Sequence, residues 1–339
     1  MKLSILIPMY NAERYIEKCL ESLMFQSIAK DDYEVIVFDD GSSDSSLKVV
    51  KNFSKKYTNI LIYTHANRGV VFTRNKLLKL AKGTYIYFVD ADDFIAHNSL
   101  SVILDFALFN TLDVIGFNTV VTHHHFKTKS KTFNENKLKL KIVSGPEYLR
   151  DNKNMRIEIW WYLIRKEVLE KNNLFFDKSD YDGDVVFTMR LFLIAKKVAY
   201  APYQVYYYFQ SEESVMRSRD AISKSRIIKY FIALIKDFSI LIDGLDNKNI
   251  PYKEEIKNNF KYRRDSFTFF TISKMIKANI NVQEIRANIF ELKLANAYPL
   301  KSFISEDYKS VKYKLLNYLF NHKRLLFTIV KFNNLFKKR

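Results

Sequence analysis

Apolar and polar residues alternate in blocks along the first hundred positions, where short apolar runs are separated by longer segments of helical periodicity. The apolar runs of strand length are residues 3–8, 34–38, 60–63 and 85–89. The segments with apolar residues at helical spacing are 12–25, 44–53 and 69–82. Because the strands lack polar–apolar alternation, the pattern predicts an α/β fold with a mostly parallel sheet and helices on both faces.

Three of the predicted strands end in polar clusters. The clusters are Pro8-Met9-Tyr10-Asn11, Asp39-Asp40 and the acidic stretch 90–93. In open α/β sheets, ligands bind beyond the carboxyl ends of the strands. We therefore expect these three clusters to converge on one ligand-binding edge.

The pattern changes after residue 93 and becomes almost wholly helical from about residue 219. Between these points we expect helices at 98–109 and 184–197, and strands at 113–121, 158–165 and 205–209. We place a domain boundary near residue 215. An α/β domain over residues 1–215 is then followed by a mainly helical C-terminal region over residues 216–339.

Composition is typical of a folded chain, because 48% of the residues are apolar and only seven Gly and five Pro occur. The one cysteine, Cys19, excludes an internal disulfide bond, and its place in a helical pattern predicts a small buried residue. No leader-like segment and no apolar run of about 18 residues occurs. We therefore expect a cytoplasmic protein that does not span a membrane.

The net charge of +18 is unevenly distributed. Residues 1–210 carry 29 Lys and Arg against 24 Asp and Glu, whereas residues 211–339 carry 26 against 13. A basic surface is compatible with nucleic acid, anionic lipid or a phosphorylated substrate, and charge alone does not choose between them.

Asp90-Ala91-Asp92, followed by Asp93, places three carboxylates at the end of an apolar strand. Two acids at positions i and i+2 of an extended chain point the same way and can hold a hard divalent cation, which in turn binds a diphosphate. An isolated Asp-x-Asp is more often a helix cap or a solvated turn. Its meaning here depends on the motifs that accompany it.

Four motifs, in order and spacing, resemble those of family-2 glycosyltransferases. They are Leu6-Ile7-Pro8-Met9-Tyr10-Asn11-Ala12, Val37-Phe38-Asp39-Asp40-Gly41-Ser42-Ser43-Asp44, Asn67-Arg68-Gly69-Val70 with Arg74-Asn75, and Phe88-Val89-Asp90-Ala91-Asp92-Asp93. The resemblance covers roughly residues 1–215 and is specific through residue 93. It implies the Rossmann-like GT-A fold, a nucleotide-diphosphate sugar donor, a Mn²⁺ or Mg²⁺ ion, and inversion at the anomeric carbon.

The resemblance also implies a set of donor-binding residues. They are Pro8, Tyr10, Asn11, Asp39, Asp40, Asn67, Gly69, Arg74, Asp90 and Ala91. In this set Pro8, Tyr10 and Asn11 line the base and ribose. Asp39 accepts a hydrogen bond from the nucleotide base, and Asp40 supports the same pocket.

The remaining members of the set concern the diphosphate. Arg74 lies near the diphosphate or braces the acidic loop, Asp90 faces the ribose or a metal-bound water, and Asp92 is the direct metal ligand. For Tyr10 and Arg74, ordinary packing and a structural ion pair stay open as alternatives.

The resemblance implies a catalytic base just before a helix, within Tyr181-Asp182-Gly183-Asp184. Asp184 takes the position of the base, and Gly183 replaces the Glu that usually precedes it. Asp182 is the second candidate, because it can supply the missing carboxylate. An inverting transfer needs one base that deprotonates the acceptor hydroxyl. Asp184 could instead serve only as the N-cap of its helix.

Two further residues are candidates on the acceptor side. Trp160 could stack on an acceptor sugar or pack in the core. Arg217 follows Ser214-Val215-Met216, which looks like a family segment that closes over the diphosphate, and it could supply a cation there.

The C-terminal stretch 309–339 interleaves basic residues with apolar residues at helical spacing. A basic amphipathic helix of this kind can rest on an anionic membrane surface, at the inner face of the plasma membrane. The alternative is a helix that packs on its own domain.

Together these features predict an inverting, metal-assisted glycosyltransferase, with UDP as the expected nucleotide of the donor. The expected acceptor is a hydroxyl of a glycan or lipid-linked glycan. The expected process is the synthesis of a cell-surface polysaccharide such as capsule or O-antigen. A nucleotidyltransferase or phosphotransferase is disfavoured, because no Gly-rich phosphate loop occurs. A nucleic-acid-binding protein would leave the convergent carboxylates unexplained, so we expect no nucleic-acid partner. A catalytically inactive nucleotide-sugar binder stays open. The sequence does not indicate an oligomeric state.

Overall fold

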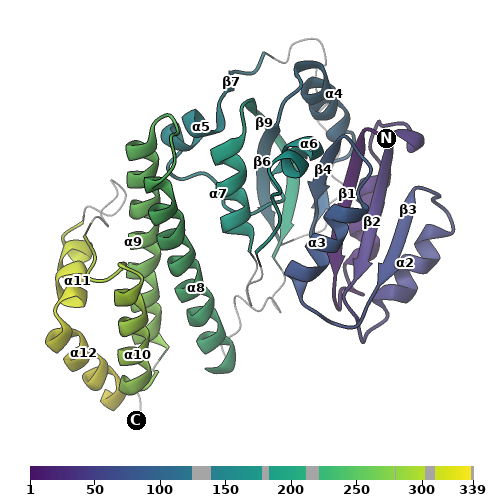
Figure 1. Cartoon of the computed structure of the whole chain (residues 1–339). Helices are drawn as coiled ribbons and strands as arrows, with labels where there is room; N and C mark the ends of the chain where they lie inside the picture. The colour runs from purple at the N-terminus through teal and green to yellow at the C-terminus, as the bar shows by residue number, and fades with distance from the viewer. Residues whose placement is uncertain (124–138, 178–182, 211–220, 279, 302–309, 337–339) are drawn as a thin grey trace. The chain divides into compact units, whose positions relative to one another are not determined.

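The computed structural model describes residues 1–123, 139–177, 183–210, 221–278, 280–301 and 310–336 (Figure 1). The chain divides into two compact units. The first comprises Met1–Tyr148 and Arg156–Ser211, and the second comprises Leu149–Met155 and Glu212–Arg339. The predicted domain boundary near residue 215 stays a prediction, because residues 211–220 lie outside the described part of the chain.

The first unit is built around one mixed, mostly parallel sheet. Within the described residues its strands are β1 (Leu3–Met9), β2 (Tyr33–Asp39), β3 (Ile60–Thr64), β4 (Tyr85–Phe88), β5 (Phe94–Ile95), β6 (Val114–Thr122), β7 (Ile142–Val143), β8 (Tyr162–Arg165) and β9 (Val198–Phe209). The order is β3-β2-β1-β4-β8-β6-β9-β5, and β7 pairs with β9. The first four strands are parallel, and β8 is antiparallel to β4 and β6.

Helices connect these strands and cover the sheet, as the alternating sequence pattern predicts (Figure 1). They are α1 (Ile16–Met24), α2 (Ser46–Ser54), α3 (Val70–Leu80), α4 (Leu100–Asn110), α5 (Gly145–Asp151), α6 (Lys166–Lys171) and α7 (Asp184–Ile194), with a short 3-10 helix at Lys30–Asp32. All seven residues of β2 are buried, which explains why this strand shows no polar–apolar alternation. Cys19 is fully buried, as expected, and burial raises the pKa of its thiol.

The sequence places two strands of this unit inaccurately. The strand expected at 158–165 begins only at Tyr162, because residues 158–161 form a turn that buries both Trp160 and Trp161. The strand expected at 205–209 begins at Val198 and pairs with β6 along its length. Register shifts beside Asn118 accommodate this long pairing.

The second unit is helical. Its helices are α8 (Ala221–Asp246), α9 (Lys253–Lys277), α10 (Val282–Leu294), α11 (Val311–Asn321) and α12 (Lys323–Phe336). The segment 149–155 joins this unit, and the amide of Asn259 in α9 donates to the carbonyl oxygens of Leu149 and Arg150, each at 3.0 Å. None of the helices in the described ranges is long and apolar enough to cross a bilayer.

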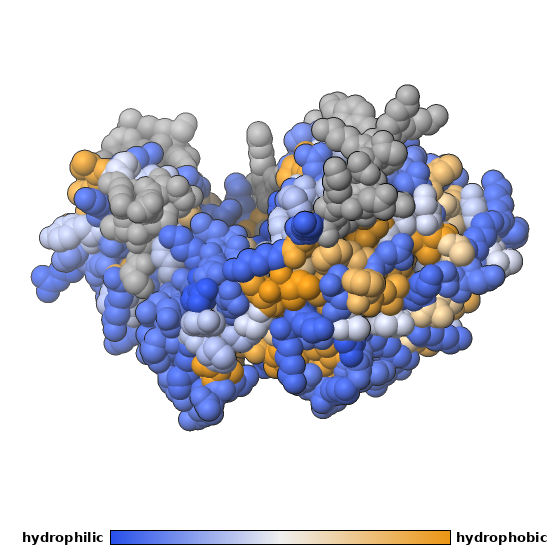
Figure 2. All heavy atoms as spheres, turned by 90° about the horizontal axis from the view of Figure 1, so that it is seen from above, coloured by the Kyte–Doolittle hydropathy of each residue, from blue (hydrophilic) through white to orange (hydrophobic). Residues whose placement is uncertain are grey.

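The basic tail forms two helices, α11 and α12, that share the core of the second unit. Phe320, Leu326 and Val330 are buried there, which supports the packing alternative for this part of the tail. Val311 and Leu315, in contrast, are 81% and 56% exposed. On the face of the molecule drawn in Figure 2, hydrophilic residues predominate and hydrophobic residues gather in patches between them.

Candidate functional site

The three polar clusters meet at one edge of the sheet, as the sequence predicts. Strands β2, β1 and β4 are adjacent and parallel, with Met9 opposite Asp39 in the register. The backbone N–H of Asp40 donates to the carbonyl of Met9 at 2.8 Å, and that of Val89 donates to Leu6 at 3.1 Å. The carboxyl ends of the three strands therefore form a common edge, where the next residues build the candidate site.

Asp39 and Asp40 are both buried but have different partners. The Asp39 carboxylate accepts hydrogen bonds from the Ser42 N–H at 3.2 Å and from the Thr64 hydroxyl at 3.1 Å. A carboxylate has about four acceptor positions, so Asp39 retains capacity for a nucleotide base. Asp40 instead accepts the backbone N–H groups of Arg68 at 2.8 Å and Gly69 at 3.0 Å. Asp40 thereby fixes the loop that contains Asn67 and Gly69.

Gly41 permits the close approach of this loop to the end of β2. Its φ of +73° is a left-handed conformation, and a Cβ atom there would lie 2.7 Å from the backbone nitrogen of Asn67. A side chain would therefore push the loop away and break the contacts of Asp40.

The loop after β1 is tied to the loop after β2. The side-chain oxygen of Asn11 accepts the Ser43 N–H at 2.8 Å, and the Asn11 N–H donates to the Ser42 hydroxyl at 2.9 Å. Tyr10, two residues after Pro8, is 53% exposed. Its ring is thus open to a ligand, and the packing alternative for Tyr10 does not describe this structure.

The acidic stretch after β4 forms a turn rather than an extended continuation of the strand. The N–H of Asp93 donates to the carbonyl of Asp90 at 3.1 Å, so the extended backbone from which we predicted that Asp90 and Asp92 point the same way is not present. Asp93 is buried and accepts the Phe209 N–H at 2.7 Å and the Tyr206 hydroxyl. Burial, followed by the charges of Asp92 and Asp90, raises the pKa of Asp93 well above its usual range.

Asp90 and Asp92 are the two acids of this turn that remain accessible. Asp92 is exposed, although the surrounding protein desolvates its carboxyl enough to raise the pKa. The Asp90 side chain is 31% exposed, and its Oδ1 lies 3.6 Å from Nη2 of Arg74. Ala91, between them, is buried.

Arg74 joins this turn to the start of α7. Its side chain is 3% exposed, and Nη1 donates to Oδ1 of Asp184 at 2.5 Å. The guanidinium also lies 5.7 Å from the centroid of the Phe176 ring. One buried cation therefore lies between two carboxylates, Asp90 and Asp184, from distant parts of the sequence.

Asp184 is the first residue of α7 and is buried, with a relative exposure of 7%. The N-cap position belongs to Gly183, which has a φ of +68° and no side chain that could cap the helix. The N-cap alternative for Asp184 is therefore wrong. The positive end of the helix dipole favours an ionised carboxylate at this position. Asp182, the second candidate for the base, lies outside the described residues.

Asn75, the neighbour of Arg74, has a positioning role that sequence reasoning missed. Its amide donates to the carbonyl of Phe176 at 2.9 Å, and its oxygen accepts the N–H of Phe176 at 2.9 Å. These paired bonds attach α3 to the segment that precedes α7. The Arg-Asn pair in the sequence was the available signal.

Trp160 packs in an aromatic stack. It is 4% exposed, and its ring lies 4.5 Å from that of Tyr206 with an interplanar angle of 6°. The packing alternative therefore describes Trp160, and an open face for an acceptor sugar is not present in this structure. Tyr206, which the sequence analysis did not assign to the site, also accepts the N–H of Asp90 at 3.3 Å. Arg217 lies outside the described residues.

The available ligands fit a hard divalent cation that is shared with a substrate. Within the part of the chain that the structure describes, no group of three or more His, Cys, Asp or Glu residues could hold a metal. Mg²⁺ is usually bound by one or two carboxylates together with substrate phosphates and water rather than by an all-protein cage. Asp90 and Asp92 meet that requirement.

Comparison with known proteins gives a family match over the same region. Residues 4–185 match the family model described as glycosyl transferase family 2. The chain is 35% identical over 217 residues to the poly(ribitol-phosphate) beta-glucosyltransferase of Bacillus spizizenii. The aligned segment covers 61% of this chain and 32% of that protein. The matched segments span roughly a third to two thirds of the lengths of the first curated relatives.

Solved structures share the fold. Residues 1–349 of Staphylococcus aureus TarS, in complex with UDP-GlcNAc, align with a TM-score of 0.68 at 20% identity, covering 100% of this chain and 92% of that one. The mannosyltransferase PcManGT of Pyrobaculum calidifontis, in complex with GDP-Man and Mn²⁺, aligns with a TM-score of 0.56 at 13% identity, covering 100% and 88%. The architecture is therefore the GT-A fold with a helical C-terminal region.

Proposed function

This chain belongs to glycosyl transferase family 2, and we propose that it transfers a sugar from a UDP-sugar to a hydroxyl group of a cell-surface glycan, with inversion. The observation that carries the proposal is the Arg74 bridge, because it brings a buried carboxylate, Asp184, beside the acidic turn at the sheet edge. The UDP-GlcNAc complex of TarS supports the choice of donor. The poly(ribitol-phosphate) relative supports a polymeric acceptor.

The donor end of the proposed site consists of the loops after β1, β2 and β4. Asp39 accepts a hydrogen bond from the uracil, and the exposed ring of Tyr10 contacts the nucleoside. Asp40 keeps the Asn67–Gly69 loop in place through its two backbone hydrogen bonds. Asp92, with Asp90, would hold Mn²⁺ or Mg²⁺, which when bound supplies positive charge for the departing diphosphate.

Asp184 is the proposed base. The acceptor oxygen forms its bond to the anomeric carbon as the bond to UDP breaks on the opposite face, and the hydroxyl proton passes to Asp184. Arg74 donates to Oδ1 of Asp184 and so orients the carboxylate. Asp182 remains the alternative base.

A donor panel followed by product analysis tests the proposal. The protein with Mn²⁺ should show a rise in melting temperature with one or more UDP-sugars, and the matching donor should be transferred to a glycan acceptor. The ¹H coupling constant of the new anomeric proton then reports the stereochemistry. A product with retained configuration would contradict the inverting mechanism, and binding without turnover would favour the inactive sugar-nucleotide binder.

We also propose that the protein acts in the cytoplasm and can bind peripherally to the inner face of the plasma membrane. The exposed face of α11 supports this, because Val311, Leu315 and Tyr318 lie at helical spacing beside the exposed Lys312 and Lys314. An anionic surface would attract these lysines.

A further inference from the structure

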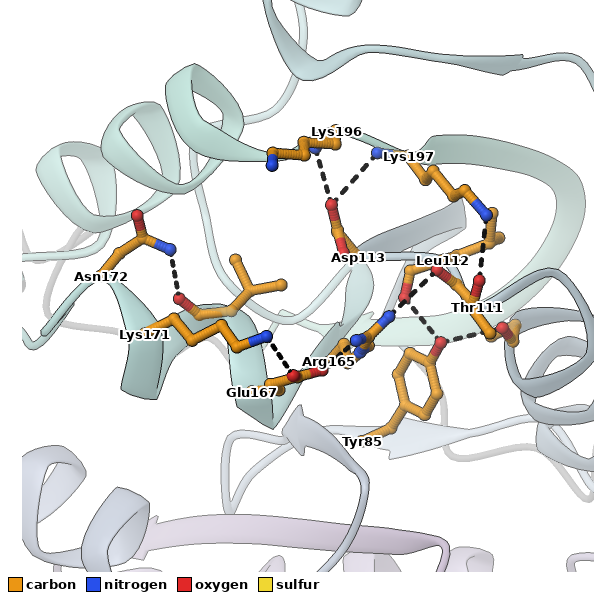
Figure 3. A network of polar contacts seen from close by, with 12 residues as sticks. Tyr85, Thr111, Leu112, Asp113, Arg165, Glu167, Lys171, Asn172, Lys196 and Lys197 are labelled. Carbon is orange, nitrogen blue, oxygen red and sulfur yellow. Dashed lines mark hydrogen bonds and ion pairs between the residues drawn. The ribbon is translucent and has the colours of Figure 1, made fainter.

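A second polar site lies at the opposite end of the sheet from the candidate donor site. A cavity of about 400 Å³ opens where β6 and β9 begin and β8 ends, and Figure 3 shows the polar residues around it. Arg165, on its wall, pairs in the sheet with Tyr85, the first residue of β4. The acidic turn follows the last residue of the same strand. All residues of the cavity belong to the first unit.

The walls of this cavity carry more positive than negative charge. Four cationic side chains line it, against two carboxylates, Asp113 and Glu167. The Glu167 carboxylate is paired with both Arg165 and Lys171. Asp113 is thus the lining carboxylate that is left to pair with the positive charges of Lys196 and Lys197.

Asp113 forms no ion pair with either ammonium group within the described ranges, because its carboxylate binds the main chain. Its Oδ2 accepts the backbone N–H groups of Lys196 at 2.7 Å and Lys197 at 3.2 Å (Figure 3). The Lys197 ammonium donates to two neutral oxygens, the carbonyl of Asn110 at 3.1 Å and the hydroxyl of Thr111 at 3.0 Å. The Lys196 ammonium has no hydrogen-bond or ion-pair partner among the described residues. Two adjacent ammonium groups therefore line the cavity without an ion-paired carboxylate in the part of the chain that the structure describes.

The backbone around these lysines is fixed by buried groups. Asp113 is 9% exposed and holds the two residues that precede β9. The hydroxyl of Tyr85, which is 1% exposed, lies 2.8 Å from the carbonyl of Ala107 and 2.6 Å from that of Leu112. Arg165 Nη1 donates to the carbonyl of Thr111 at 3.4 Å. A ligand would therefore meet a wall whose main chain is already ordered, which lowers the entropic cost of binding.

We propose that this cavity binds a phosphate group of a polyanionic acceptor chain, at a site separate from the transfer reaction. Lysines bind phosphate as point charges. A volume near 400 Å³ lies in the range of small-ligand pockets and accommodates a phosphate with its attached polyol.

The position of the cavity decides which phosphate it takes. The seven-residue strand β1 alone spans about 20 Å, so the diphosphate of a donor at the carboxyl edge does not reach the cavity. A polymer with a phosphate in every repeat can place one unit in the cavity and another at the reactive edge. This second contact raises the apparent affinity for long chains without adding contacts at the reaction centre.

This inference rests on the proposed function only for the identity of the acceptor, and binding can be measured without turnover. The test compares the full-length protein with the variant Lys196→Gln/Lys197→Gln. The control is Lys55→Gln/Lys56→Gln, which removes two adjacent exposed lysines at the end of α2. Fluorescently labelled poly(ribitol phosphate) is the probe, titrated by polarisation at several salt concentrations.

We expect the cavity variant to bind the long polymer roughly tenfold more weakly, with a shallower salt dependence, while the control binds like the parent protein. Hydrolysis of UDP-GlcNAc without acceptor should be equal in all three proteins. Inorganic phosphate should compete with the polymer in the parent protein and much less in the cavity variant.

Three results would overturn the inference. They are unchanged polymer affinity in the cavity variant, an equal loss in the control, or loss of binding to phosphatidylglycerol vesicles with polymer binding intact, which would assign the lysines to a lipid headgroup. Absence of sugar transfer in every protein would instead count against the proposed function, because polymer binding is read separately.

Discussion

At the scale of single residues, the candidate site depends on Arg74, because this residue contacts both Asp90 and Asp184. It lies 110 positions before Asp184 in the sequence, yet its guanidinium nitrogen is 2.5 Å from that carboxylate. The same side chain is within 3.6 Å of Asp90. Removal of the cation would leave neighbouring carboxylates, one of them buried, without their shared counter-charge.

We predict that Arg74→Ala lowers the free energy of unfolding by about 3–5 kcal/mol, the usual cost of breaking a buried ion pair. The matched control is Arg190→Ala, which removes an exposed partner of Asp177 and should cost less than about 1 kcal/mol. Urea denaturation at pH 7 measures both. If both variants lose the same free energy of unfolding, the buried Arg74 pair stabilises the protein no more than the exposed Arg190 pair.

Sequence motifs identified the acids of the site but not the way in which they are joined. Asp39, Asp90 and Asp184 all lie near their expected strand or helix ends, because each follows a clear change of hydrophobic pattern. The roles of Asn75 and Tyr206 were missed, since both act through contacts to residues about a hundred positions away. The Arg74-Asn75 motif marks Asn75 itself, but the local pattern does not indicate the distant partner of either residue.

At the scale of elements, α11 divides its apolar residues between two environments. Phe320 is 2% exposed and belongs to the core of the helical unit, whereas Leu315 on the same helix is 56% exposed. The sequence analysis assigned Leu315 to the apolar stripe of the tail but did not assign Phe320 to it. Phe320 is buried because its ring packs against Phe269 of α9, with the ring centroids 5.0 Å apart.

These two positions give opposite predictions. Phe320→Ala should destabilise the protein by about 3–5 kcal/mol, as is usual for a buried phenylalanine. Leu315→Ser should leave stability within about 0.5 kcal/mol but weaken co-sedimentation with phosphatidylglycerol vesicles. If Leu315→Ser binds such vesicles as the parent does, the proposed membrane contact of α11 is wrong.

At the scale of the whole molecule, the sequence predicted the β3-β2-β1-β4 half of the sheet better than the rest. These strands are separated by helices of clear periodicity, and their buried apolar runs match the observed bounds within a few residues. The insertion of the antiparallel β8 between β4 and β6 was not predicted. Strand order in that half depends on pairing between distant segments, which periodicity does not encode.

The proposed requirement of donor binding for a metal ion also depends on the whole carboxyl edge of the sheet. We predict that EDTA abolishes UDP-sugar binding by the parent protein and that excess Mn²⁺ restores it. Asp92→Asn should bind the donor without this Mn²⁺ dependence or not at all, with an unchanged melting temperature, because the exposed Asp92 does not support the core. Isothermal titration with and without EDTA measures both effects. Donor binding by Asp92→Asn with the parent's Mn²⁺ dependence would remove Asp92 from the metal site.

The central claim is that Asp184 is the base of an inverting glycosyl transfer, and Asp184→Asn tests it most directly. Asparagine retains an oxygen that can accept from Arg74 but cannot take the acceptor proton. Asp177→Asn, a change at an exposed acid, is the control, and Asp182→Asn tests the alternative base.

The measurement is turnover under saturating UDP-sugar and acceptor, together with the dissociation constant of the donor. We predict that Asp184→Asn lowers turnover by about 10²–10⁴-fold and leaves donor affinity within about twofold, while the control is unaffected. Full activity in Asp184→Asn, with loss of activity in Asp182→Asn, would contradict the assignment of Asp184 as the base.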